Sequence, residues 1–422
     1  MSINMNAQSC YGIAGPSTSG ENSQVEEETD EEIDVLNCTD DQISLPPSQP
    51  KISHYLRTLV PNFDTRYNQL WTLKYPHCIK ASLTLIADIN HLNYRNGLHD
   101  FELQVYLIEE FIFGKIDELC KKNQARSCLE FQMIDTLFNF LLALSKTPDI
   151  RNNIVLTIFP CDVPRCVFFG NFICYCIDRA QSQILDAAGL WLQQAGMKSP
   201  HSKELVMHII NYFLHESADT KPNFIATSTT APHFISNMLT VVTYIFTSSN
   251  PPNEILRLVD TWIHTNPNVL TVPLSYIPPL PPGAITMPPV LPIAGLLFWC
   301  CLHPAKEEAY HYDRRNAIEC ERNALFTSIH HRVLFAVSSL KTNNTIQHLI
   351  AAQDLEVIIE KLVEHLRTPL ATVSKASYIY AAGRLFEAIQ TTTAVKCIYG
   401  NKQKLQYLLG ILGRVHYFYT NS

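Results

Sequence analysis

The sequence predicts an all-α protein, an irregular helical-repeat α-solenoid preceded by a disordered acidic N-terminal arm. Apolar residues recur at helical spacing along most of the chain, which favours amphipathic helices. Hairpin turns are scarce: the 422 residues include 14 glycines, and Asn96-Gly97 is the one Asn-Gly or Asp-Gly pair. Because 46% of the residues are hydrophobic, the chain can bury a large core, which excludes a wholly disordered or fibrous protein.

The acidic arm covers residues 1–50, which hold ten acidic residues and no Lys or Arg. The formal net charge of −7 is therefore the sum of −10 in this arm and +3 in the rest of the chain. The like charges from Glu26 to Asp34 and the single aromatic residue, Tyr11, predict disorder. The first 23 residues lack the basic and apolar regions of a secretory signal.

From about Tyr55 onward the apolar pattern becomes helical. Val167–Ile177 and Val241–Phe246 are rich in β-branched and aromatic residues and could be strands, but the lack of hairpin turns favours helices. No fixed-period motif identifies a named repeat type. The expected helices cover 77–92, 100–119, 127–145, 164–180, 183–195, 203–215, 232–247, 255–263, 288–302, 310–341, 355–366, 375–391 and 405–415.

Two helices carry start signals in the sequence. Ser199 is expected to cap a helix with Pro200 at its first position, where a missing N–H costs nothing. Asn250 and Pro251 are expected to open the next amphipathic helix in the same way. Toward the C-terminus, the clearest periodicity runs from Leu355 to Leu366.

A proline-rich loop at 267–289 is expected to separate an N-terminal helical array, 51–266, from a C-terminal array, 290–422. Between Asp260 and Lys306 there is no Lys, Arg, Asp or Glu, but ten of the chain's 25 prolines lie there. Proline at this density excludes a membrane-spanning helix, and we expect no membrane association.

Within this loop, Pro278, Pro279, Pro281 and Pro282 are the candidate partner-binding residues. Two Pro-Pro pairs hold the backbone extended before any partner arrives, so binding costs less ordering entropy. The sequence therefore predicts a protein contact at this loop.

Catalytic motifs are missing from the sequence: it has no phosphate-binding glycine loop, no H-E-x-x-H and no G-x-S-x-G. We therefore expect no enzyme, no catalytic residues and no cofactor. With a body charge of +3 and no long basic cluster, we also expect no autonomous nucleic-acid binding.

Two clusters of cysteine and histidine residues are candidate metal sites. Neither the group at Cys161, Cys166, Cys174 and Cys176 nor the group at Cys300, Cys301 and His303 has the C-x-x-C spacing of a structural zinc site. Buried free thiols are the favoured interpretation. The adjacent His330 and His331 are expected to face different sides of one helix.

Four sequence runs occur in an order that resembles the Integrator complex subunit 15 family. The resemblance extends from about Phe101 to Phe418, and it is the order and spacing of the runs that carries it. The runs are Leu107–Phe113, Ala187–Gln193, Trp262–Pro267 and Leu291–Cys300.

The resemblance implies a HEAT/armadillo-like fold and a nuclear, non-catalytic scaffold subunit of Integrator, which acts in small nuclear RNA 3′-end processing and transcription attenuation. It implies other Integrator subunits as partners, namely the module with subunits 10, 13 and 14, and an indirect association with RNA polymerase II. The acidic arm and the run Ala305–His311, which stands in place of a basic loop, depart from the family pattern. The alternative is a generic helical-repeat protein-interaction adaptor outside Integrator, which the same helical pattern would serve.

We predict that deleting residues 1–50 leaves the fold intact, because this segment has too little apolar surface to belong to a core. Thermal unfolding of the truncated chain, followed by circular dichroism, checks the prediction. A single cooperative transition near that of the full chain is expected. Loss of cooperative unfolding would mean that the boundary is wrong.

Overall fold

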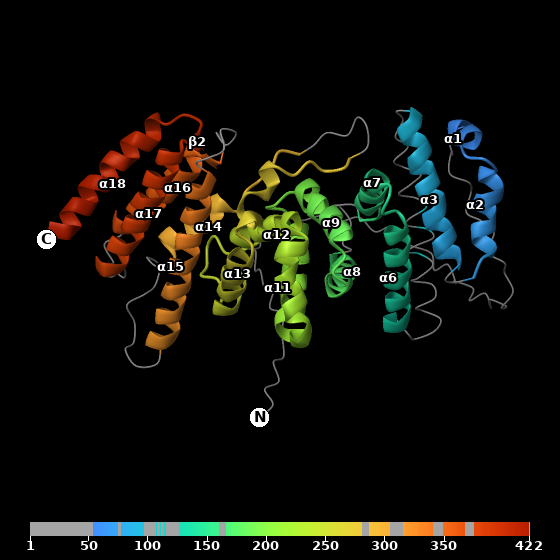
Figure 1. Cartoon of the computed structure of the whole chain (residues 1–422), viewed down its shortest axis with the longest axis horizontal. Helices are drawn as coiled ribbons and strands as arrows, with labels where there is room; N and C mark the ends of the chain where they lie inside the picture. Colours follow the sequence, from blue (N-terminus) through green and yellow to red (C-terminus); the bar gives the residue numbers. More distant parts are fainter. Residues whose placement is uncertain are drawn as a thin grey trace, which may run out of the picture. The chain divides into compact units, whose positions relative to one another are not determined.

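The computed structural model describes residues 54–74, 77–96, 107, 110, 114, 126–159, 166–280, 287–303, 315–340, 349–367 and 375–421 (Figure 1). All of them belong to one unit, Pro50–Ser422, of the two into which the chain divides. The predicted arm and most of the expected helix at 100–119 lie outside the described residues.

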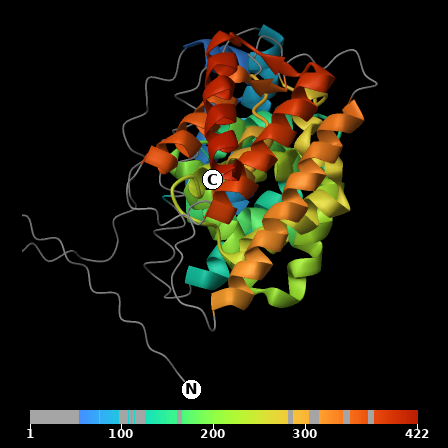
Figure 2. The same cartoon turned by 90° about the vertical axis from the view of Figure 1, so that its left-hand side faces the viewer.

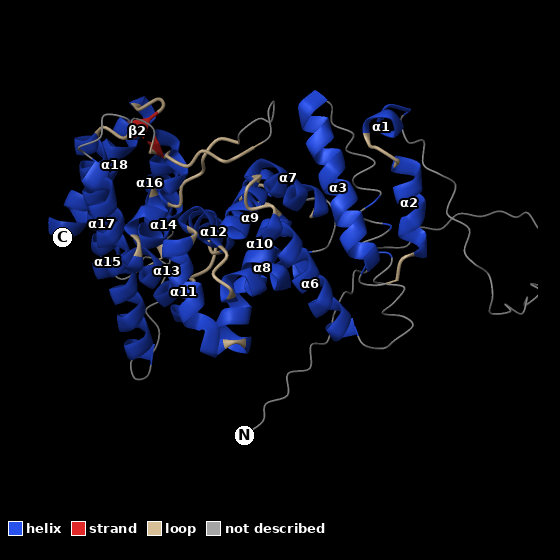
Figure 3. Cartoon of the chain, turned by 45° about the vertical axis from the view of Figure 1, so that its right-hand side comes forward, coloured by secondary structure: helices blue, strands red, loops and turns tan. Residues whose placement is uncertain are grey.

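The described residues are mostly helical, as the sequence predicts (Figure 3). The helices are α1 (His54–Leu59), α2 (Phe63–Thr72), α3 (His77–Asn96), α6 (Arg126–Ala143), α7 (Pro148–Ile158), α8 (Cys166–Asp178), α9 (Ser182–Ala195), α10 (Pro200–Asn211), α11 (Lys221–Thr230), α12 (Pro232–Ile245), α13 (Asn253–Thr265), α14 (Ile293–Leu302), α15 (Arg315–Ser339), α16 (Ala352–Arg367), α17 (Lys375–Val395) and α18 (Gln403–Asn421). Short π or 3₁₀ turns are η2 (Tyr212–Glu216), η3 (Ala218–Thr220), η4 (Pro267–Leu270) and η5 (Val272–Leu274).

The helices pack in two rows. In the first row, α3, α7, α9, α12, α14 and α16 contact one another in succession. In the second, α6, α8, α11, α13, α15 and α17 do the same, with α10 packed between α8 and α12. Contacts such as α8 with α9 and α14 with α15 join the rows. Figure 2 looks along this succession from the end that carries α16, α17 and α18.

The helical interpretation of the two ambiguous runs is confirmed, because Val167–Ile177 lies in α8 and Val241–Phe246 continues α12 to its C-cap. Four helices have no counterpart among the expected ranges: α1, α2, α7 and α11. In α7 the reason is visible: Arg151 and Asn152 are buried, so polar residues occupy positions where the apolar pattern would mark a core face. The parallel strands β1 (Ile350–Ala351) and β2 (Ile398–Tyr399) were not expected either.

One predicted helix start is confirmed and one is wrong. The Ser199 Oγ atom accepts a hydrogen bond from the Ser202 backbone N–H at 3.1 Å, with Pro200 at the first helical position. By contrast, α13 begins at Asn253, after Pro252. Because a proline disfavours helical backbone in the residue before it, Pro252 prevents the helix from starting at Pro251. Asn250 therefore does not cap α13.

Three buried tryptophans join neighbouring helices within a row. The indole N–H of Trp191 in α9 donates to the carbonyl of Phe159, which caps α7. Trp262 in α13 donates to Phe224 in α11, and Trp299 in α14 donates to Thr243 in α12, both at 3.2 Å. Each bond satisfies a buried polar group on both helices, so it fixes how the two helices lie against each other.

Close approach of α14 to α12 requires a glycine. A Cβ atom at Gly295 would lie 2.1 Å from the Oγ1 atom of Thr243. The expected helix at 288–302 begins only at Ile293, after Pro292, so Gly295 lies in its first turn.

We predict opposite effects for two glycine-to-alanine substitutions. Gly295→Ala should lower the free energy of unfolding by about 1–3 kcal/mol, because overpacking forces α12 and α14 apart. Gly383→Ala in α17 is the matched control, since a Cβ there meets nothing within 4 Å. It should raise the free energy of unfolding by about 0.5–1 kcal/mol, because alanine favours helix over glycine. Urea unfolding measures the free energy of unfolding of both variants. Equal changes in the two would contradict the close approach of Gly295 to Thr243.

Candidate functional site: the proline strap and its seat

Residues 267–280, the first of the two described parts of the proline-rich loop, are called the proline strap. Its first half is not extended as predicted, because η4 and η5 form 3₁₀ turns over 267–274. Proline fits the first position of such turns, since its φ is already helical. The turns are anchored by Asn266, whose Oδ1 accepts from the Asn268 N–H at 3.1 Å and whose Nδ2 donates to the Ser228 carbonyl at 2.7 Å.

The second half of the strap, 276–280, has no regular secondary structure and runs past α12 and α9 toward α7 (Figure 1). The Pro279 carbonyl accepts a hydrogen bond from the Asn152 side-chain amide in α7 at 3.0 Å. Pro278 and Pro279 are half-buried, whereas Pro281 and Pro282 lie outside the described residues. The strap therefore makes an intramolecular contact across 127 residues of sequence.

Tyr276 anchors the strap to α12. Its ring stacks on the imidazole of His233, with centroids 3.8 Å apart and planes at 18°. The His233 Nε2 atom lies 3.3 Å from the amide of Asn237 and 3.4 Å from that of Gln193. Burial lowers the pKa of His233 to about 4, so the ring is neutral at neutral pH.

Arg151 orients the amide that holds Pro279. Its guanidinium donates to the Asn152 Oδ1 atom at 3.2 Å and to the Gln183 Oε1 atom at 3.0 Å. With its oxygen engaged by Arg151, the Asn152 amide nitrogen is directed to the strap. Burial lowers the pKa of Arg151, which the nearby carboxyl of Asp186 partly offsets, while burial raises the pKa of Asp186 to about 6.

The outer side of the loop exposes apolar residues. The Ile277 side chain is 88% exposed, and Leu274 and Met287 are also exposed. The sequence interpretation singled out the prolines and did not name these three residues, although they lie between prolines in the same segment. Anchored backbone with outward-facing apolar side chains is an arrangement suited to contact with another protein.

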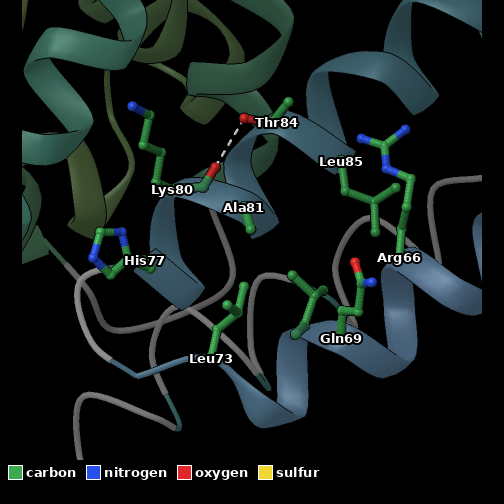
Figure 4. Close-up of a pocket in the computed structure, with 9 residues that line it drawn as sticks. Arg66, Gln69, Leu73, His77, Lys80, Ala81, Thr84 and Leu85 are labelled. Carbon is green, nitrogen blue, oxygen red and sulfur yellow. Dashed lines mark hydrogen bonds between the residues drawn. The ribbon is translucent and has the colours of Figure 1, made fainter.

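Apart from the strap, the surface has a hollow of about 380 Å³ between α2 and α3 (Figure 4). Leu70, Leu73 and Leu85 form an apolar floor, and Arg66 and Lys80 lie at its sides. The Arg66 guanidinium pairs with the Asp88 carboxylate at 2.7 Å. Its lining residues include no carboxylate, so the hollow offers mainly cationic and apolar contacts.

Four of the cysteines named in the sequence analysis, Cys174, Cys176, Cys300 and Cys301, are free buried thiols, as expected. The side chains of Cys161 and Cys166 lie outside what the structure describes. Burial raises the pKa of all four thiols, that of Cys300 to about 12. They therefore stay protonated at neutral pH, and the thiol is a poor nucleophile and metal ligand. Among the described residues, no group of three His, Cys, Asp or Glu side chains could hold a metal ion.

His330 and His331 face different sides of α15, as predicted. His330 is buried and lies 3.2 Å from a carboxylate oxygen of Glu387, whereas His331 is exposed. Within the described chain, no helix combines the length and the apolar character needed to cross a bilayer.

Two rows of packed helices, crossed on the surface by an anchored strap, define a mostly helical protein. A family model described as Integrator complex subunit 15 matches residues 65–414. The chain belongs to the Integrator complex subunit 15 family.

Two relatives carry the same description. The chain is 27% identical to Integrator complex subunit 15 of Drosophila melanogaster over 360 residues, which cover 78% of this chain and 89% of the relative. It is 23% identical to Integrator complex subunit 15 of Homo sapiens over 216 residues, covering 47% and 46% of the two chains. The family resemblance stated from the sequence is thereby confirmed.

We predict that His233 makes the protein less stable in mild acid. Its folded-state pKa of about 4 lies below the ordinary 6.5, so below pH 6.5 the unfolded chain binds a proton that the folded chain rejects. Between pH 7 and pH 5 this costs about 2 kcal/mol. Urea unfolding at both pH values should show a smaller loss for His233→Gln than for the unchanged protein. An equal loss in both would mean that His233 is not the cause.

Proposed function

We propose that this protein is a non-catalytic scaffold subunit of the Integrator complex that acts in the nucleus. The observation that carries the proposal is the strap: its backbone is fixed by Asn152 and Tyr276, and it presents Ile277 outward. The raised thiol pKa values and the absence of metal-binding groups among the described residues favour a role in binding rather than catalysis.

The helical rows form an irregular HEAT/armadillo-like α-solenoid in this proposal. Successive contacts along each row support it, as do the tryptophan hydrogen bonds between row neighbours. The proposed arrays 51–266 and 290–422 adjoin at the 267–289 segment, and α12 with α14 and α13 with α15 pack across that division. The arrays would then form one continuous stack.

The proposed partners are other Integrator subunits, namely the module with subunits 10, 13 and 14, with an indirect association with RNA polymerase II. The Drosophila relative, which aligns over 89% of its length, is named as an Integrator subunit, and this supports the assignment. Through these contacts the protein would serve small nuclear RNA 3′-end processing and transcription attenuation.

The contact surface proposed is the proline strap with its continuation: Pro278, Pro279, Pro281 and Pro282 together with the exposed Ile277. The backbone is held before binding, so a partner loses little affinity to loop ordering. An isoleucine that is 88% exposed gains apolar burial when a partner covers it, worth about 1.5–3 kcal/mol for full burial.

Ile277→Asp should reduce recovery of Integrator subunits with the tagged full-length chain from nuclear extract by at least about tenfold, because a buried unpaired carboxylate costs more than 1.4 kcal/mol. Replacing residues 278–282 by a Gly/Ser linker should also reduce recovery. The melting temperature should stay nearly unchanged for Ile277→Asp, whose side chain is exposed. Quantitative mass spectrometry of the recovered proteins is the measurement.

Val167→Asp is the matched control, since Val167 is 53% exposed and lies on α8, which is in the other row from α7 and α12, the helices that hold the strap. It should leave recovery unchanged. Undiminished recovery with Ile277→Asp would remove the strap from the proposal. If the unchanged chain recovers vesicle-associated proteins and no Integrator subunits, the generic adaptor is favoured instead.

A further inference from the structure

A hollow of about 460 Å³ lies where α6, α8 and the π-helical turn η2 meet. The turn is set by the Ser217 N–H, which donates to the Tyr212 carbonyl five residues earlier at 2.8 Å. Such wide turns are rare and lie frequently at functional sites, because they re-aim a side chain. Here the turn places Tyr212 at the wall of the hollow, opposite Glu130 and Phe131 of α6.

The hollow carries more acidic than basic groups. Glu130 and Asp178 line it, and the Asp135 carboxylate accepts a hydrogen bond from the hydroxyl of the lining residue Tyr175 at 2.5 Å. Arg179 is the one cationic residue in the lining, and its guanidinium carbon lies 3.8 Å from the centroid of the Tyr175 ring. The charge balance therefore favours a positively charged occupant.

The two carboxylates in the lining, those of Glu130 and Asp178, differ in their hydrogen bonds. The side-chain amide of Asn171 donates to the Glu130 Oε1 atom at 2.8 Å, and the Asn171 Oδ1 atom lies 2.8 Å from the His208 Nε2 atom, which fixes the position of Glu130. The Asp178 carboxylate has a side-chain hydrogen bond with Thr220, while its Oδ1 atom is buried and has no hydrogen-bond partner among the described residues. A buried acceptor without a donor is unfavourable, so a donor that reaches Oδ1 would gain a hydrogen bond there.

The aromatic side chains of the hollow favour a planar cation. Phe131 is 57% exposed, and its ring meets the Tyr175 ring edge to face at 5.9 Å. Planar guanidinium groups stack on aromatic faces and form hydrogen bonds to carboxylates in their own plane, which a spherical ammonium cannot do as well. Arg179 on Tyr175 shows this stacking within the protein itself.

We propose that this hollow binds an arginine side chain of a partner protein. The guanidinium would stack against Phe131 and Tyr212 and donate to the Glu130 carboxylate and to the Oδ1 atom of Asp178. The inference does not depend on the proline strap, because the hollow and the strap have no residue in common.

The test uses the full-length chain and N-acetyl-arginine methylamide as the probe, with binding measured by saturation-transfer NMR. N-acetyl-citrulline methylamide has nearly the same shape without the charge and should bind at least about tenfold more weakly, since a hydrogen bond between charged groups is worth about 1.5–3 kcal/mol. Asp178→Asn and Phe131→Ala should each weaken binding of the arginine probe severalfold. Equal binding of arginine and citrulline would overturn the proposal.

Two controls separate binding from folding. Glu364→Gln removes an exposed carboxylate on α16 and should leave arginine binding unchanged. Burial raises the pKa of Asp178, so the neutral Asp178→Asn variant should melt no lower than the unchanged protein. If Asp178→Asn melts lower and binds arginine as before, the carboxylate is structural and the proposal fails.

Discussion

Buried indole donors hold the helices in register. A carbonyl in the last turn of a helix has no partner within that helix, so burying it requires a donor from elsewhere. Trp191 and Trp299 meet this need at Phe159 and Thr243, each from the next helix of the same row. A helix sliding along its neighbour would lose such a bond and leave two buried groups unsatisfied. The relative position of α7 and α9, and that of α12 and α14, follow from this constraint.

The seat of the strap, formed by Arg151, Asn152 and His233, gathers buried polar side chains within a core that is mostly apolar. His233 stacks on Tyr276, and Asn152 donates a hydrogen bond to the Pro279 carbonyl. The buried guanidinium of Arg151 orients Asn152, and the nearby carboxyl of Asp186 partly offsets the cost of burying its charge. Apolar contacts alone would allow several positions for an extended segment, whereas hydrogen bonds of fixed direction allow one. The strap can thus present apolar side chains to the outside in a defined place.

The sequence was sufficient for features that repeat and insufficient for those that depend on packing. The apolar period predicted α13, α16 and α18, and the clustered prolines predicted an irregular segment between the helices. It could not predict that Asn152 holds Pro279, because the two are 127 residues apart and only the fold brings them together. For the same reason α7 was missed, since Arg151 reads as a surface residue until its partner Gln183 is known. The hollow around Asp178 likewise has no sequence signal, as its walls come from three elements.

The contact between Asn152 and Pro279 also bears on how the protein unfolds. In a stack in which each helix touches only its neighbours, one end can melt while the other stays folded. The strap, which follows α13 in the chain, is joined to α7 by the hydrogen bond from Asn152 to Pro279. Unfolding that starts at either end and reaches α7 or α12 must therefore break the contact of Asn152 with Pro279 or that of His233 with Tyr276. The middle of the protein should consequently open as one cooperative block, with the slowest amide hydrogen exchange in α7, α9 and α12.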